Sequence, residues 1–180
     1  MKNIAFIAFI IVCLAQIGVP TGMVIHHEKV LKEGRVFRFK TAPVDPNDPF
    51  RGKYVQLRFD NNFAYVPDPN DWTSGETAYA TLYNDYDGFA QIETLEKSLP
   101  PDNQDCLEVK IDYISDGAVY VKLPFDRFYL KENLAPLAEQ RYFDASRDST
   151  VNTYALVHVK NGKAVLEDVL IDGKSIKAPE

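Results

Sequence analysis

The longest hydrophobic segment of the chain is continuous rather than periodic. No charged side chain occurs between Ile4 and Ile25, and a helix of that length spans about 33 Å at about 1.5 Å per residue. The hydrocarbon core of a bilayer is about 30 Å thick. We therefore predict that Ile4–Ile25 crosses a lipid bilayer, with residues 1–27 as a membrane anchor and residues 28–180 as a separate domain.

Two other interpretations of this segment stay open. Lys2 could be the charged start of a secretory signal, with Cys13-Leu14-Ala15 as a poor cleavage site before Gln16, which would leave a soluble exported domain. The segment could also be a buried amino-terminal helix of a soluble protein. We favour a retained anchor, because the apolar run continues as far as Val24 and a mature soluble terminus has no use for it.

Beyond residue 29 the pattern changes to short alternating runs. Val36–Lys40 and Lys53–Phe59 have a period of two, which is typical of strands with one buried face. Asp-Gly and Asn-Gly pairs support the positive φ angles of tight hairpin turns. They predict three hairpins: Thr77–Leu95 turned at Asp85–Gly88, Cys106–Phe125 turned at Asp116-Gly117, and Tyr154–Ile176 turned at Asn161-Gly162.

One short segment near residues 133–145 has the helical period instead. It places five side chains on one face, with Asn133 as a cap and Pro136 in the first turn; the five are Leu134, Leu137, Ala138, Tyr142 and Ala145. The fold class predicted from these patterns is mainly β, a β-rich α+β protein. A transmembrane helix precedes an antiparallel barrel- or sandwich-like domain with one short helix.

Three motifs of the chain are similar to one bacterial family. PVDPNDPFRGKYVQLRF resembles the pattern P-V-D-P-R-D-x-x-R-G-D-Y-V-x-L-x-Y, and AYATLYNDYDGF and FDRFYLKEN resemble two further stretches. On these motifs, which lie in consistent order between Leu31 and Ile176, the chain is identified as a member of the GDYxxLxY family. Lys53 stands where the family has its aspartate, and Asn133 where it usually has glycine.

The resemblance implies a single-span bacterial protein with a β-rich domain and no established biochemical activity. It also implies a candidate binding surface made of motif residues, namely Pro43, Asp45, Pro46, Asp48, Arg51, Gly52, Tyr54, Leu57, Arg127 and Glu132. For the loop itself we favour a structural interpretation over a binding surface: Asp45 and Asp48 cap turns, and Arg51 pairs with one of them.

The expected location is the bacterial cytoplasmic membrane, with the domain on the extracytoplasmic side. The positive-inside rule favours the reverse orientation, since Lys29, Lys32 and Arg35 follow the span and only Lys2 precedes it. We nevertheless favour export, because a short charged start before a long apolar run is how exported chains begin.

Charge argues against some classes of partner. The formal net charge is −6 and Lys2 is the only charged residue of the anchor, so the domain carries −7. Such a surface disfavours nucleic acid and anionic headgroups.

Three histidines, two of them adjacent, and isolated serines provide no metal site or nucleophile motif, so we expect no cofactor. Cys106 is expected to be a small buried hydrophobe.

Two classes of function remain. The favoured one is a membrane-anchored, non-enzymatic accessory domain that binds a neighbouring membrane protein, because loops on rigid scaffolds commonly carry binding. The other is an envelope hydrolase that uses the carboxylates of Asp45, Asp48 and Glu132 with Arg127 as an electrostatic partner. The aromatic residues of the second long turn, Phe63, Tyr65 and Trp72, belong either to the core or to a carbohydrate- or protein-facing surface.

Overall fold

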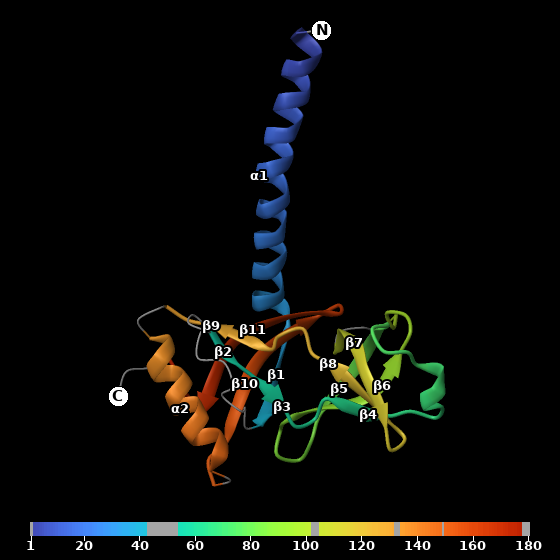
Figure 1. Ribbon diagram of the computed structural model, residues 1–180, viewed down its shortest axis with the longest axis vertical. Coiled ribbons are helices and arrows are strands. Elements are labelled where there is room, and N and C mark those ends of the chain that lie inside the picture. Colours follow the sequence, from blue (N-terminus) through green and yellow to red (C-terminus); the bar gives the residue numbers. More distant parts are fainter. Residues whose placement is uncertain (1, 43–53, 102–104, 132–133, 149, 178–180) are drawn as a thin grey trace.

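The computed structural model describes residues 2–42, 54–101, 105–131, 134–148 and 150–177. Strands make up 45% of the structure. They form a nearly closed, antiparallel, barrel-like arrangement from which one long helix projects (Figure 1). The predicted β-rich class, with an apolar amino-terminal helix and one further helix, is confirmed.

Helix α1 (Lys2–Glu33) is apolar on every side and continues through Pro20. Its apolar side chains are at least 40% exposed over most of its length; they are Phe6, Ile7, Phe9, Ile10, Ile11, Val12, Leu14, Ile17, Val19, Met23, Val24 and Ile25. In the described part of the chain it is the one helix long and apolar enough to cross a membrane. Because these side chains do not pack into the domain, the interpretation as a buried helix of a soluble protein is wrong.

The carboxyl end of α1 is fitted closely to the domain. Val30 is only 2% exposed, and the helix ends where the amide of Gly34 donates to the carbonyl of Val30 at 2.8 Å. Glu33 accepts a hydrogen bond from the ammonium group of Lys160. A Cβ on Gly34 would lie 2.4 Å from the Val30 oxygen and 3.1 Å from the Val159 oxygen. We call these contacts the helix joint.

Replacing Gly34 with alanine should destabilise the helix joint. The new methyl group meets backbone atoms, which cannot rotate away, so we expect a loss of about 1–3 kcal/mol, as in other overpacked sites. Thermal unfolding of the full-length protein measures the effect. The matched control is Gly18→Ala in the same helix, where a Cβ meets nothing within 4 Å. Equal melting temperatures for the two variants would contradict the tight fit.

The first sheet has the order β12-β11-β10-β1-β3 and carries the helix joint. Its strands are β1 (Arg35–Ala42), β3 (Arg58–Phe59), β10 (Thr153–Lys160), β11 (Lys163–Ile171) and β12 (Lys174–Ser175). The predicted carboxyl-terminal hairpin is confirmed as β10 and β11. Asn161 and Gly162 at its turn have φ angles of 51° and 78°, the left-handed conformation that such turns require.

The second sheet has the order β4-β8-β7-β5-β6. Its strands are β4 (Phe63–Tyr65), β5 (Thr77–Asn84), β6 (Ala90–Glu96), β7 (Cys106–Ser115) and β8 (Ala118–Lys122), with the short 3₁₀ helix η1 (Pro69–Asp71) between β4 and β5. Both predicted hairpins, β5–β6 and β7–β8, are confirmed. Strand β4 was not predicted, because its three residues lie within a turn-rich stretch that has no room for a visible alternation.

The predicted strand Lys53–Phe59 is wrong as a single element. The chain forms β2 (Tyr54–Gln56), which pairs with β9 (Arg127–Tyr129), and then β3, which pairs with β1. Between them, the amide of Leu57 donates to the carbonyl of Asp126 at 2.8 Å rather than to a ladder. The alternation itself survives the break, since Val55 and Leu57 are buried. The alternation of apolar and polar residues therefore predicts which face of a strand is buried, but it does not predict which strand it pairs with.

A bridge and an aromatic cluster join the two sheets. Gly162 at the β10–β11 turn pairs with Leu107 of β7, and its amide donates to the carbonyl of Cys106 at 3.0 Å. Deeper in the core, the ring of Phe39 packs edge-on against Phe59 and Phe125, with centroids 6.0 and 5.0 Å apart. The core is therefore continuous across both sheets.

Helix α2 (Ala135–Arg147) packs against β2 and corresponds to the predicted short helix. Its buried residues are Ala135, Ala138 and Tyr142. Leu137, expected on the buried face, is 51% exposed, because the helix turns its alanine edge toward the sheet. The N-cap residue is Leu134, which makes no capping side-chain hydrogen bond. Asn133, the expected cap, lies outside the described residues.

Candidate functional site

Three of the predicted site residues lie in the described part of the chain: Tyr54, Leu57 and Arg127. The others, Pro43, Asp45, Pro46, Asp48, Arg51, Gly52 and Glu132, lie outside it. The carboxylate constellation of the hydrolase hypothesis, Asp45, Asp48 and Glu132, therefore belongs entirely to residues that the structure does not describe.

Strands β2 and β9 bring two of the three motifs together. Tyr54 pairs with Tyr129 in the ladder, and Gln56 pairs with Arg127. The guanidinium carbon of Arg127 lies 5.2 Å from the Tyr54 ring centroid, and the two tyrosine rings are 5.5 Å apart. We call Tyr54, Arg127 and Tyr129 the motif cluster. In Figure 1, β2 and β9 lie on the side of the domain from which α1 rises.

The motif cluster is a surface feature with a persistent positive charge. Tyr129 is 65% exposed, and the Arg127 side chain is about half exposed. The hydrogen bond with Tyr129 raises the pKa of Arg127 above its ordinary value, and Tyr54 and Asp126 act in the same direction. Leu57, in contrast, is only 2% exposed and contributes to the core. Sequence reasoning missed Tyr129, because no turn or periodic signal marks β9.

The turn of the second motif, between β5 and β6, is built around Asp85. Its carboxylate accepts hydrogen bonds from the amides of Asp87 and Phe89 at 3.0 and 2.8 Å, and from the side-chain amide of Gln91 at 2.8 Å. These bonds, led by that from Phe89, lower the pKa of Asp85 below its ordinary value. The segment is a hairpin turn, with Gly88 at a φ of 77°, as its residues predict.

Arg38 of β1 fastens this turn to the first sheet. Its guanidinium donates to the carbonyls of Gly88 and Asp87 at 3.1 and 3.2 Å. It also lies 5.4 Å from the centroid of the Phe89 ring and 6.0 Å from that of Tyr154. A Cβ on Gly88 would displace the Arg38 guanidinium, which lies 2.0 Å from that position, and the φ of 77° favours glycine there in any case. No pattern in the sequence indicates that Arg38 contacts this turn.

Asp85→Ala should loosen the turn and lower stability by about 1 kcal/mol, because two backbone amides lose their charged acceptor. The pKa of Asp85 is below the ordinary carboxyl value of 3.8 in the folded state. The stabilisation of the folded state by the Asp85 carboxylate is therefore complete above pH 3.8. It is lost as the pH falls through the lowered pKa of the folded state. The matched control is Asp87→Ala, whose carboxylate makes no bond to the described residues. Similar melting temperatures at pH 7 would refute the assignment.

A polar cleft of about 760 Å³ lies beside this turn, between the two sheets. Its lining residues are Arg38, Lys40, Asn61, Asp85, Asp87, Phe89, Asn152, Tyr154, Asp172 and Gly173. Two cations face three carboxylates there. Asp85 and Asp172 both accept backbone hydrogen bonds, whereas the ammonium group of Lys40 has no ion-pair partner among the described residues.

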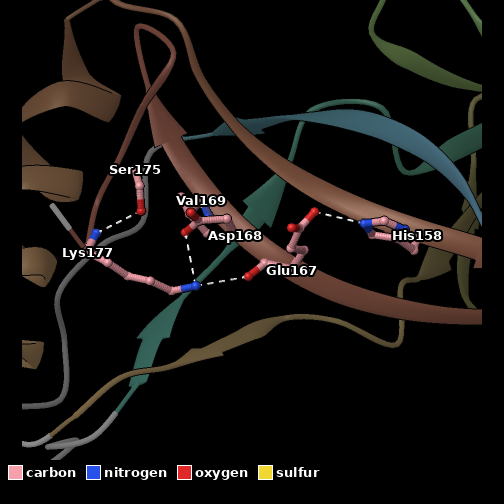
Figure 2. A network of polar contacts seen from close by, with 6 residues as sticks. All are labelled: His158, Glu167, Asp168, Val169, Ser175 and Lys177. Atoms are coloured by element: carbon pink, nitrogen blue, oxygen red, sulfur yellow. Dashed lines mark hydrogen bonds and ion pairs between the residues drawn. The ribbon is translucent and has the colours of Figure 1, made fainter. Parts of the chain in front are cut away.

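A second polar network lies on β10 and β11 (Figure 2). A bulge leaves Glu167 without a ladder partner, and its carboxylate lies 2.8 Å from Nε2 of His158. The ammonium group of Lys177 donates to the carbonyl of Glu167 at 3.1 Å; it also lies 3.5 Å from Asp168 and 4.8 Å from the Phe128 ring centroid. This network ties the carboxyl-terminal strands to β9 and so supports the motif cluster.

Metal and thiol chemistry find little support among the described residues. No group of three or more His, Cys, Asp or Glu side chains there could hold a metal ion. Cys106 is 1% exposed, and burial raises the pKa of its thiol to about 11, so the nucleophilic thiolate is scarce at neutral pH. Cys106 is the buried hydrophobe that the sequence predicts.

One family is similar to this chain over most of its length. The family described as the GDYXXLXY protein matches residues 16–169, which include the helix joint, the motif cluster and the Asp85 turn. The chain belongs to the GDYXXLXY family. No curated protein and no solved structure matches it. The GDYXXLXY family has no known function, so the family supplies a name for the fold but no activity.

Proposed function

We propose that this GDYXXLXY protein is a membrane-anchored, non-enzymatic accessory protein that binds a neighbouring membrane protein. The single observation that carries the proposal is α1: the apolar side chains described between Phe6 and Ile25 are exposed on every side of the helix. Exposed apolar surface of this extent is stable only in lipid or against a partner. We further propose that the membrane is the bacterial cytoplasmic membrane and that the domain lies on its extracytoplasmic side.

The helix joint supports an accessory role. Val30 is buried against the domain, the backbone at Gly34 lies too close to the Val30 and Val159 oxygens to accept a side chain, and Glu33 accepts a hydrogen bond from Lys160. A loose linker would let the domain sample many orientations, but a fitted joint holds one face of the domain toward the membrane. A partner in the same membrane then meets a preoriented surface, which lowers the cost of binding.

The motif cluster is the surface that we assign to this partner. It lies on the α1 side of the domain, and tyrosine and arginine are the residue types that most often carry binding energy at protein interfaces. Tyr129 is 65% exposed, yet its ring is already held against Tyr54. The ladder and the ring contacts fix the cluster before any partner arrives.

Photo-crosslinking in native membranes tests this function. A photoreactive amino acid in place of Tyr129 should yield a discrete adduct with a second protein, identified by mass spectrometry. The matched control position is Tyr86, which is fully exposed in the β5–β6 turn and lies outside the motif cluster; it should yield no such adduct. Recovery of the monomer alone from position 129, under conditions that crosslink a known membrane complex, would overturn the proposal.

A further inference from the structure

We propose that the groove between β4 and β6 is a binding site for a neutral oligosaccharide, a role that goes beyond the proposed protein contact and uses other strands. The groove has a volume of about 460 Å³, within the range of about 300–1,000 Å³ that is typical of small-ligand sites. Its lining residues are Asn61, Phe63, Ala64, Tyr65, Tyr83, Gln91, Ile92 and Glu93.

The groove is the seam of the nearly closed second sheet. β4 and β6 are the outermost strands of that sheet, and they lie side by side without a ladder between them in the described residues. Ala64 and Ile92 are buried and form the floor. Their neighbours in each strand point outward, since successive side chains of a strand alternate.

Aromatic rings form the walls of the groove. Tyr65 is 72% exposed and Tyr83 is 46% exposed, large fractions for rings of this size. Phe63 packs edge-on against Tyr65 with centroids 5.6 Å apart, and it contacts Tyr120 of β8 at 5.4 Å. These contacts hold the rings of Phe63 and Tyr65 in place in the free protein. The negative face of an aromatic ring attracts the weakly positive C–H face of a pyranose ring.

Hydrogen-bonding groups for sugar hydroxyls lie beside the rings. Glu93 is the extra residue of a bulge, because Thr81 pairs with Thr94 and Leu82 pairs with Ile92. Bulges commonly redirect a side chain next to a binding site. The side chains of Asn61 and Glu93 make no hydrogen bond to other described residues, so they can accept or donate to a ligand. The amide of Gln91 is held by Asp85 at 2.8 Å.

The charge of the groove selects a neutral ligand. Glu93 is the one charged side chain among its described lining residues, and no lysine or arginine lines it. Phosphorylated, sulfated and nucleic-acid ligands therefore lack a counter-charge. Exposed tyrosines such as Tyr65 and Tyr83 also occur at protein interfaces, and the experiment below distinguishes a protein occupant from a sugar. Aromatic faces combined with amides and one carboxylate fit a polyhydroxylated ring with an apolar face.

Isothermal titration calorimetry on the full-length protein in phosphatidylcholine nanodiscs tests the site. Sugar-based detergents are avoided because their headgroups would compete with the oligosaccharide probes. The probes are the β-1,4-linked hexamers of glucose and of N-acetylglucosamine. We expect saturable binding of at least one, weakened about tenfold by Tyr65→Ala and by Tyr83→Ala through the loss of a stacked ring. Tyr65→Phe should keep most of the affinity, and Glu93→Gln should reduce it. The matched control, Tyr86→Ala, removes an exposed tyrosine outside the groove and should change nothing.

Three results would overturn the site. The first is the absence of binding by either hexamer to the wild-type protein. The second is an affinity that Tyr65→Ala and Tyr83→Ala leave unchanged while both variants keep the wild-type melting temperature. The third is capture of an envelope protein by the wild type but not by Tyr65→Ala, without hexamer binding, which would assign this face to a protein partner.

Discussion

Phe39→Ala should cost about 3–5 kcal/mol of folding free energy, the usual effect of removing a buried aromatic side chain. Phe39 is 2% exposed and meets rings from two other segments, Phe59 of β3 and Phe125 after β8. Those two rings lie 5.4 Å from each other, so all three contact one another. Removing the central ring leaves a cavity at the point where the two sheets share their core.

Thermal unfolding of the full-length protein, followed by circular dichroism of the strands, measures this loss. A chain of this size loses about 2–4 °C for each kcal/mol, so the melting temperature should fall by about 10 °C. The matched control is Val36→Ala in the same strand, whose side chain is 45% exposed. A melting temperature for Phe39→Ala close to that of the control would contradict the role of this aromatic cluster in the core.

Leu14→Arg should remove much of the protein from the membrane fraction. Leu14 lies near the middle of the apolar run and is 65% exposed, so the charged group would face lipid. An arginine at the centre of a spanning helix raises the free energy of insertion by about 2.5–3.5 kcal/mol. The readout is the share of protein that sediments with membranes.

The matched control for this substitution is Leu137→Arg, the same change at an exposed leucine of α2. Its effect on localisation should be negligible, because Leu137 lies on the domain and not in the apolar run. Equal distributions for the two variants would show that α1 is not held in lipid.

The sequence predicted the hairpins because their turns are decided locally. Asp116, Gly117, Asn161 and Gly162 all have positive φ angles, and few residue types tolerate them, so the turn residues alone indicate the connection. The Asp85 turn was predictable for the same reason. Burial along β1 and β2 also followed the alternation of apolar residues.

The sequence did not reveal contacts that depend on the tertiary arrangement. β9 has three residues, too few for a period, and it forms only because β2 lies beside it. Leu137 matched the helical period, but the sheet surface accepts the smaller Ala138 instead. Arg38 and Lys40 occupy ordinary outward positions of a strand, and only the fold places them beside the Asp85 turn. A surface site built from three chain segments leaves no local signal in any one of them.

We expect α1 to be retained in the mature protein, and intact mass spectrometry after carbonate washing of membranes distinguishes retention from cleavage. We expect the protein in the carbonate-resistant pellet, released only by detergent, with a mass that includes Ile4–Ile25. A washed-out protein whose mass corresponds to a mature chain beginning at Gln16 would show that α1 is cleaved, and the domain would then be a soluble exported protein without a membrane anchor.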